Sequence, residues 1–146
     1  MVAQSSKDYR NFKAAPENTY SANESDTNAD TCCLGSNFVI LNYTRRTADV
    51  YPYDSSYEPI SNVPIVSGAT AYDDPSTGLT WLLIINEGLY YGDKLDHTLI
   101  NPNQIRFNQI DYWDNPFDHD KPLSIDIPGV LTVPLHMKGT KIQFIT

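Results

Sequence analysis

The sequence predicts a single, mostly β domain with one or two short helices, and three observations support this. The chain has 146 residues, the size of one ordinary domain, and 40% of them are hydrophobic, enough to form a core. Its 10 tyrosines and 10 prolines favour strands separated by turns over long helices. From residue 33 onward, short apolar runs are separated by turn residues.

The apolar runs predict a series of strands. Residues 1–23 are polar and aperiodic, so we expect a flexible N-terminal linker followed by a domain over residues 24–146. The run Phe38–Leu41 is apolar enough to be buried on both faces of a sheet. The turn D-D-P-S-T-G at 73–78 predicts a hairpin between the strands before and after it. The expected strands are residues 38–43, 63–72, 79–86, 123–127, 130–135 and 141–145.

The remaining segments predict a short helix and loops. Apolar residues between Lys94 and Asn108 fit a short helix, whose length Pro102 limits. Val50–Tyr57 and Asp111–Lys121 mix aromatic, proline and polar residues, which is typical of turns and exposed loops.

Charge and composition exclude several classes of protein. The net charge is −8, and Arg45-Arg46 is the only tight basic pair, so we expect no direct binding of nucleic acid. The longest apolar run, Trp81–Ile85, is too short to span a membrane. Met1–Arg10 has no apolar stretch of the kind a signal peptide carries. We therefore expect a cytoplasmic or nuclear protein that is not secreted.

The segment Asp26–Thr31 carries the strongest functional signal. It reads D-T-N-A-D-T, one residue away from the D-T-G-A-D signature of retroviral-type aspartic proteases, with Asn28 in place of the glycine. Asparagine tolerates the left-handed backbone conformation better than most residues. The resemblance implies that Asp26 is catalytic, that Thr27, Asn28 and Ala29 form the active-site loop, and that Asp30 helps to bind substrate.

The chemistry of such a site requires two carboxylates. Two acidic groups about 3 Å apart cannot both ionise, so one activates water while the other, protonated, hydrogen-bonds the substrate carbonyl. One motif supplies one carboxylate, so Asp26 must meet its copy across a two-fold axis in a homodimer. Thr27 would then hydrogen-bond between the two subunits. Water is the nucleophile, so no metal and no organic cofactor are implied.

A longer resemblance points to one group of these proteases. Residues 26–33 (D-T-N-A-D-T-C-C) look like the D-S-H-A-D-T-C segment of copia-type retrotransposon polyproteins. Residues 89–105 resemble the block that closes the protease region in those elements. This implies a retropepsin-like closed β-barrel that is an endopeptidase and cuts its own polyprotein as a homodimer. It also implies a location in the cytoplasm, within virus-like particles or in the nucleus.

The resemblance implies two further elements of the site. A flap hairpin should come from residues 50–66, where Tyr51, Tyr53 and Tyr57 would face the peptide. Leu89–Gly92 would correspond to the apolar-apolar-Gly element that packs beside the catalytic loop. Ser25 stands where an apolar strand residue usually precedes the aspartate, which favours an alternative: a catalytically inactive relative acting as a protein-binding or structural β-domain.

Other candidate sites are weaker. Cys32-Cys33 has no neighbouring C-x-x-C or histidine to complete a zinc site, so we expect reduced thiols. His97 and His119 lie near aspartates, a pattern more typical of solvated loops than of metal sites. Tyr112-Trp113, in a polar loop, is the best candidate for an aromatic binding platform, whereas Trp81 is expected in the core.

Overall fold

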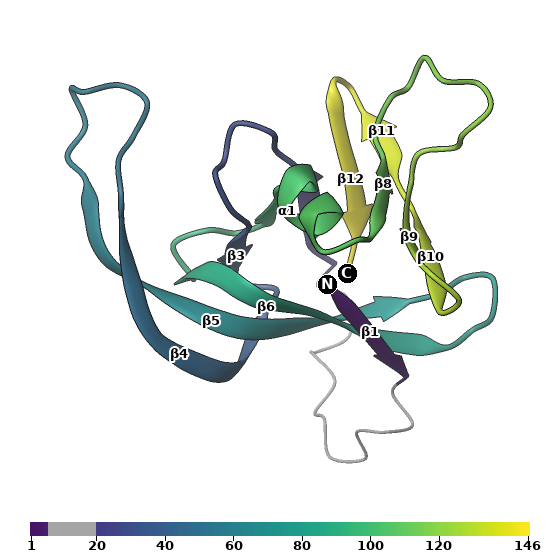
Figure 1. Cartoon of the computed structure of the whole chain (residues 1–146), viewed down its shortest axis with the longest axis horizontal. Helices are drawn as coiled ribbons and strands as arrows, with labels where there is room; N and C mark the ends of the chain where they lie inside the picture. Colours follow the sequence, from purple (N-terminus) through teal and green to yellow (C-terminus); the bar gives the residue numbers. More distant parts are fainter. Residues whose placement is uncertain (6–19) are drawn as a thin grey trace.

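A computed structural model describes residues 1–5 and 20–146, and over these residues the expected mostly β architecture is confirmed. The larger sheet has the strand order β11-β12-β2-β7-β3-β6-β5-β4, with β1 paired to β6, and the smaller sheet has the order β10-β9-β8 (Figure 1). The elements are β1 (Val2–Ser5), β2 (Ala22–Ser25), β3 (Cys33–Gly35), β4 (Val39–Val50), β5 (Ile60–Asp73), β6 (Thr80–Gly92), β7 (Thr98–Ile100), α1 (Pro102–Phe107), β8 (Asp111–Trp113), β9 (Ser124–Ile127), β10 (Leu131–Pro134), β11 (His136–Lys138) and β12 (Lys141–Ile145).

The larger sheet is open. Within the described residues, its order runs from β11 at one edge to β4 at the other, and these edge strands do not pair with each other. The closed β-barrel expected from the resemblance is therefore not found in this part of the chain. The reason lies in the hairpin of β4 and β5, which extends away from the body of the molecule instead of returning to the opposite edge (Figure 1).

The hairpin of β5 and β6 forms where the sequence predicts it. The two strands pair antiparallel from Asp73–Thr80 inward, across the turn at 73–78. Asp74 fixes this turn, because its carboxylate accepts hydrogen bonds from the Ser76 and Thr77 side chains, each at 2.7 Å.

The expectation that Phe38–Leu41 is buried on both faces is wrong beyond Phe38. Phe38 is 2% exposed, but Val39 and Leu41 are 46% and 44% exposed. Both lie on β4, an edge strand, so one side of their strand has no neighbour in the sheet. Register shifts along β4 bend it outward, one of them next to Arg45, which has a φ of 64°.

The N-terminal segment contributes strands to the larger sheet. Val2–Ser5, expected in a linker, forms β1 and pairs antiparallel with Trp81–Ile84 of β6. Ala22 begins β2, just before the expected domain boundary at residue 24. The rest of the expected linker, residues 6–19, lies outside the described residues.

A buried polar network holds β2, although its sequence A-N-E-S looks unsuited to a strand. Asn23 is 1% exposed, donates to Thr146 Oγ1 at 2.9 Å and accepts from Asn37 Nδ2 at 2.9 Å. Asn37 Oδ1 in turn accepts from Thr98 Oγ1 at 2.7 Å. Because buried polar groups must be satisfied, this network fixes β2 beside β7 and the C-terminal strand.

Helix α1 begins at Pro102, which the sequence analysis treated as a limit to a helix. Asn101 is the N-cap, and its side chain accepts a hydrogen bond from the Gln104 amide at 2.8 Å. Proline suits the first helical position because its missing N–H would have no helical partner there. Among the described residues, no helix is long and apolar enough to cross a membrane.

Candidate functional site

The Asp26 motif lies on a loop between two strands that flank a third. Asp26 follows β2 directly, and the loop leads into β3 at Cys33. Strand β7 lies between them, parallel to β2 and antiparallel to β3. The Asp26 amide donates to the Ile100 carbonyl at 2.9 Å, so the last residue of β7 fixes the start of the loop.

The Asp26 carboxylate is half-buried and held by its own loop. Its Oδ1 accepts a hydrogen bond from the Asn28 amide at 2.8 Å. Asn28 is not among the residues with positive φ, so the loop turns here without the left-handed conformation that a glycine would permit. Thr27 and Asn28 are both exposed, which leaves this end of the loop accessible to another chain.

The far end of the loop is held by α1 and its cap. Asn101 donates from Nδ2 to the Ala29 carbonyl. Gln104 Oε1 accepts from Thr31 Oγ1 and from the Cys32 amide, both at 2.7 Å. The side chains of Asn101 and Gln104 thus form hydrogen bonds with three residues of the loop: Ala29, Thr31 and Cys32.

A cavity of about 490 Å³ adjoins the loop. One wall is the loop itself, and the others come from the hairpin of β4 and β5 and from β6. Asp26 does not line the cavity, but Cys33 does. The Asp26 carboxylate lies close enough to Cys33 to raise the pKa of its thiol. The lining residues are Asn28, Ala29, Asp30, Thr31, Cys33, Arg46, Ala48, Asp49, Val50, Tyr51, Ile65, Glu87, Gly88 and Leu89.

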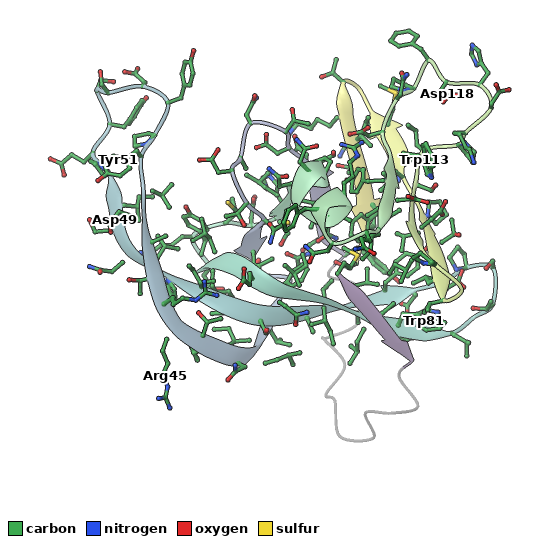
Figure 2. All side chains as sticks on the ribbon, in the orientation of Figure 1. Arg45, Asp49, Tyr51, Trp81, Trp113 and Asp118 are labelled. Carbon is green, nitrogen blue, oxygen red and sulfur yellow. The ribbon has the colours of Figure 1, made fainter. Side chains whose placement is uncertain are left out.

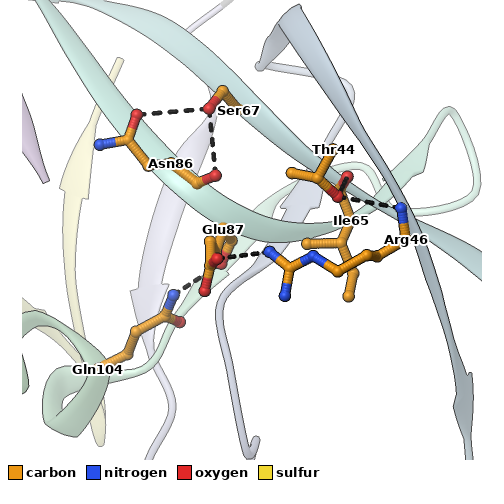
Figure 3. A network of polar contacts seen from close by, with 7 residues as sticks. All are labelled: Thr44, Arg46, Ile65, Ser67, Asn86, Glu87 and Gln104. Atoms are coloured by element: carbon orange, nitrogen blue, oxygen red, sulfur yellow. Dashed lines mark hydrogen bonds and ion pairs between the residues drawn. The ribbon is translucent and has the colours of Figure 1, made fainter.

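A polar network connects the hairpin with the other cavity walls (Figure 3). Arg46 on β4 forms an ion pair with Glu87 on β6, with Nη2 and Oε1 2.5 Å apart. The Glu87 carbonyl accepts from Gln104 Nε2 at 2.6 Å. Thr44 Oγ1 donates to the Ile65 carbonyl at 2.7 Å and so ties the two hairpin strands together. The hairpin, β6 and α1 are therefore linked around the cavity.

The two cysteines are protonated thiols at neutral pH. Burial raises the pKa of Cys32 to about 11. Burial also raises the pKa of Cys33 to about 11, and the nearby Asp26 carboxylate acts in the same direction. Neither thiol is a ready nucleophile, since only the thiolate attacks.

Only some of the residues predicted to bind substrate line the cavity. Asp30 is exposed and lines the cavity. Tyr51 also lines it, at the point where β4 ends (Figure 2). Tyr53 and Tyr57 do not line it; Tyr53 is fully exposed on the hairpin tip.

The segment Leu89–Gly92 lies beside the end of the loop at Cys32, but it forms no backbone hydrogen bond with Asp26. It belongs to β6, and the Leu89 amide donates to the Cys32 carbonyl at 2.9 Å. The residues that contact Asp26 and Ala29 are Ile100 and Asn101. The strand and cap at 98–101 therefore support the loop more directly than 89–92 does.

Tyr112 cannot contribute to the expected aromatic platform. Tyr112 lies in β8 and is 4% exposed, so the placement of Tyr112-Trp113 in a loop is wrong. Trp113 is half-buried: its Nε1 donates to Asp126 Oδ2 at 3.2 Å, and Lys121 Nζ lies 4.9 Å from its ring centre. Trp113 and Asp118 lie on the side of the molecule away from the hairpin (Figure 2).

The acidic and histidine clusters do not assemble a metal site. Over residues 1–5 and 20–146, no group of three or more histidine, cysteine, aspartate or glutamate side chains is arranged to hold a metal ion. His97 instead contacts Asp96 through Nδ1 at 2.5 Å and Glu24 through Nε2 at 3.7 Å, beside the start of β7.

Sequence reasoning missed Asn101 and Gln104. A local signal for Asn101 was present, because asparagine followed by proline is typical of an N-cap and a first helical residue. No local signal marked Gln104, whose partners Thr31 and Cys32 are more than 70 residues away in sequence.

No family model, no curated protein and no solved structure matches this chain. The interpretation of the site therefore depends on its own residues and geometry.

Proposed function

We propose that this chain is a retropepsin-like aspartic endopeptidase domain of a copia-type retrotransposon polyprotein, which hydrolyses peptide bonds as a homodimer. The observation that carries the proposal is the position of the D-T-N-A-D loop. It joins β2 to β3, is fixed by Ile100, and forms a wall of a cavity that a long β-hairpin borders. The loop, the cavity and the hairpin give a peptide a place to bind beside one carboxylate, and the second carboxylate must come from another copy of the chain.

The proposed mechanism assigns a role to each part of the loop. Asp26 from each subunit supplies one carboxylate, and the pair shares a proton between them. The ionised member takes a proton from water, whose oxygen attacks the peptide carbonyl, while the protonated member hydrogen-bonds the carbonyl oxygen. When the tetrahedral intermediate collapses, the C–N bond breaks and the leaving amine takes a proton from the pair, which again holds one shared proton. The exposed Thr27 contacts the partner subunit. Asp30 and Tyr51 in the cavity wall contact the peptide.

The hairpin of β4 and β5 is the proposed flap. Its strand β4 contributes Arg46, Ala48 and Asp49 to the cavity wall, and its tip extends beyond the body of the molecule (Figure 1). A peptide lying in the cavity would therefore contact the hairpin on one side and the Asp26 loop on the other. Closure of the hairpin over the peptide would exclude bulk solvent from the site while the attacking water stays bound between the carboxylates.

Cleavage of an unstructured protein such as casein at about pH 5 tests the proposal, because a shared carboxylate pair works in mildly acidic solution. The wild-type chain should cleave casein. An aspartic-protease inhibitor should block this cleavage, and Asp26→Asn should abolish it. Asp93→Asn removes an exposed carboxylate away from the cavity and should leave cleavage unchanged. Equal cleavage by Asp26→Asn would overturn the proposal.

The alternative, a catalytically inactive relative that binds protein or supports the polyprotein structurally, makes a different prediction. A folded dimer that cleaves nothing, in the wild-type chain as in Asp26→Asn, would favour it. The burial of Tyr112 removes one residue of the aromatic platform on which a binding role was based.

A further inference from the structure

Gln104 occupies an unusual position for a helix residue near a surface loop. Its side-chain oxygen accepts two hydrogen bonds, from Thr31 Oγ1 and from the Cys32 amide, each at 2.7 Å. Its side-chain nitrogen donates to the Glu87 carbonyl at 2.6 Å. Both lone pairs of the amide oxygen are used, and one side chain therefore joins α1, the Asp26 loop and β6.

The helix gives this side chain a fixed base. The Gln104 amide is capped by Asn101 Oδ1 at 2.8 Å, and the next residue, Ile105, is 1% exposed and packed in the core. The loop has few contacts of its own to define its shape. Asp26 Oδ1 accepts from the Asn28 amide, and the segment from Ala29 to the Cys32 amide is held by Asn101 and Gln104. The Cys32 carbonyl then accepts from the Leu89 amide at 2.9 Å.

We propose that Gln104 is a positioning residue of the Asp26 loop, which sets the shape of the loop and fixes it against the cavity wall formed by β6. This inference rests on the proposed function, because it makes the geometry of Asp26 depend on Gln104. Gln104 itself touches neither Asp26 nor the cavity. Catalytic groups must be held to within a fraction of an ångström, so a loosened loop should impair the chemical step more than substrate binding.

A set of variants separates this role from general stabilisation. Gln104→Met keeps the length of the side chain and removes all three hydrogen bonds. Gln104→Glu keeps an acceptor for Thr31 and Cys32 and removes the donor to Glu87. Asn103→Ala, on the same helix, removes an exposed side chain whose one contact is with Arg106 and serves as the matched control.

The first readout, amide hydrogen exchange at Cys32, needs no enzymatic activity. This amide donates to Gln104 Oε1, so Gln104→Met should exchange about fivefold faster or more, the factor expected for one lost hydrogen bond. Gln104→Glu should stay close to the wild-type rate, and Asn103→Ala should equal it. An unchanged Cys32 exchange rate in Gln104→Met, with the protein folded, would overturn the proposal.

The second readout is the separation of kcat from KM for cleavage. Gln104→Met should lower kcat by about tenfold to a hundredfold with little change in KM, the loss expected for a misplaced catalytic group. Gln104→Glu should restore most of the lost kcat. Faster exchange at Cys32 with an unchanged kcat would overturn the positioning role. If the wild-type chain cleaves nothing while Gln104→Met still exchanges faster, the proposed function fails and Gln104 holds a loop that does no catalysis.

Discussion

At the scale of single residues, the buried thiol of Cys32 makes stability depend on alkaline pH. Burial raises its pKa from 9.0 to about 11. Below pH 9 the thiol is protonated in both the folded and the unfolded chain, so its contribution to the free energy of unfolding is fully present. As pH rises from 9 to about 11, the unfolded chain releases the proton and the folded chain does not, so the free energy of unfolding decreases.

The expected loss for this one group is about 2 to 3 kcal/mol, and it can be measured by urea unfolding across that pH range. Cys33, with a pKa also raised to about 11, should add a second contribution. Between pH 9 and pH 10, below the ordinary pKa of tyrosine, the decrease in Cys32→Ala should therefore be about half as steep. Above pH 10, Tyr112, whose pKa burial raises to about 12, adds to the decrease in both proteins. An identical slope in the variant would show that the thiol of Cys32 is not the cause.

The charge of the cavity wall leads to a prediction about substrate preference. Asp30, Asp49 and Glu87 line the cavity, and Arg46 is already paired with Glu87. The uncompensated charge is negative, so peptides with lysine or arginine should bind better than matched peptides with glutamate. Because these groups are solvent-exposed, Asp30→Asn should weaken binding of the basic peptide by only about twofold to fivefold.

Fluorescence polarisation with the Asp26→Asn chain measures this binding without cleavage. Added salt should reduce the preference for basic peptides, since exposed charges are screened. Glu58→Gln changes an exposed carboxylate that is not in the cavity wall and should have no effect. Equal affinity for basic and acidic peptides would contradict the electrostatic argument.

At the scale of elements, the N-cap of α1 links helix stability to the loop. Asn101→Ala removes the acceptor for the Gln104 amide and the donor to the Ala29 carbonyl, so it should lower the free energy of unfolding by about 1 to 2 kcal/mol. Asn101→Ser keeps an N-cap acceptor for the Gln104 amide and removes only the donor to Ala29, so it should lose less. Urea unfolding of both variants tests this; equal losses would mean that the cap contributes nothing.

The contrast between β2 and the hairpin of β5 and β6 shows how much of the fold the sequence could predict. The hairpin follows from local patterns, because its apolar strands flank a turn fixed by Asp74. Strand β2 does not, since Asn23 is stabilised by Asn37 and Thr146, which are distant in sequence. The exposure of β4 was also unpredictable, because an apolar run does not reveal that its strand lies at a sheet edge.

At the scale of the whole molecule, the candidate site combines local and distant contributions in the same way. The Asp26 motif is contiguous, and the sequence alone identified it. The supporting residues come from another part of the chain and contact the loop because β7 lies between β2 and β3; they are Ile100, Asn101 and Gln104. A single chain presents one Asp26, and the second carboxylate of the proposed site must come from another copy.

This requirement predicts how activity depends on mixing active and inactive chains. If wild-type and Asp26→Asn chains exchange partners freely, only dimers with two wild-type subunits have both carboxylates. At constant total protein, an equal mixture should therefore retain about one quarter of the activity, because the fraction of fully active dimers is the square of the wild-type fraction. A monomeric enzyme would retain about one half. A linear response to mixing would rule out a shared site, since each chain would then work alone.

The exposed Thr27 leads to a second test of the dimer. Thr27→Arg should lower the activity, and it should also lower the fraction of dimer measured by sedimentation, without unfolding the chain.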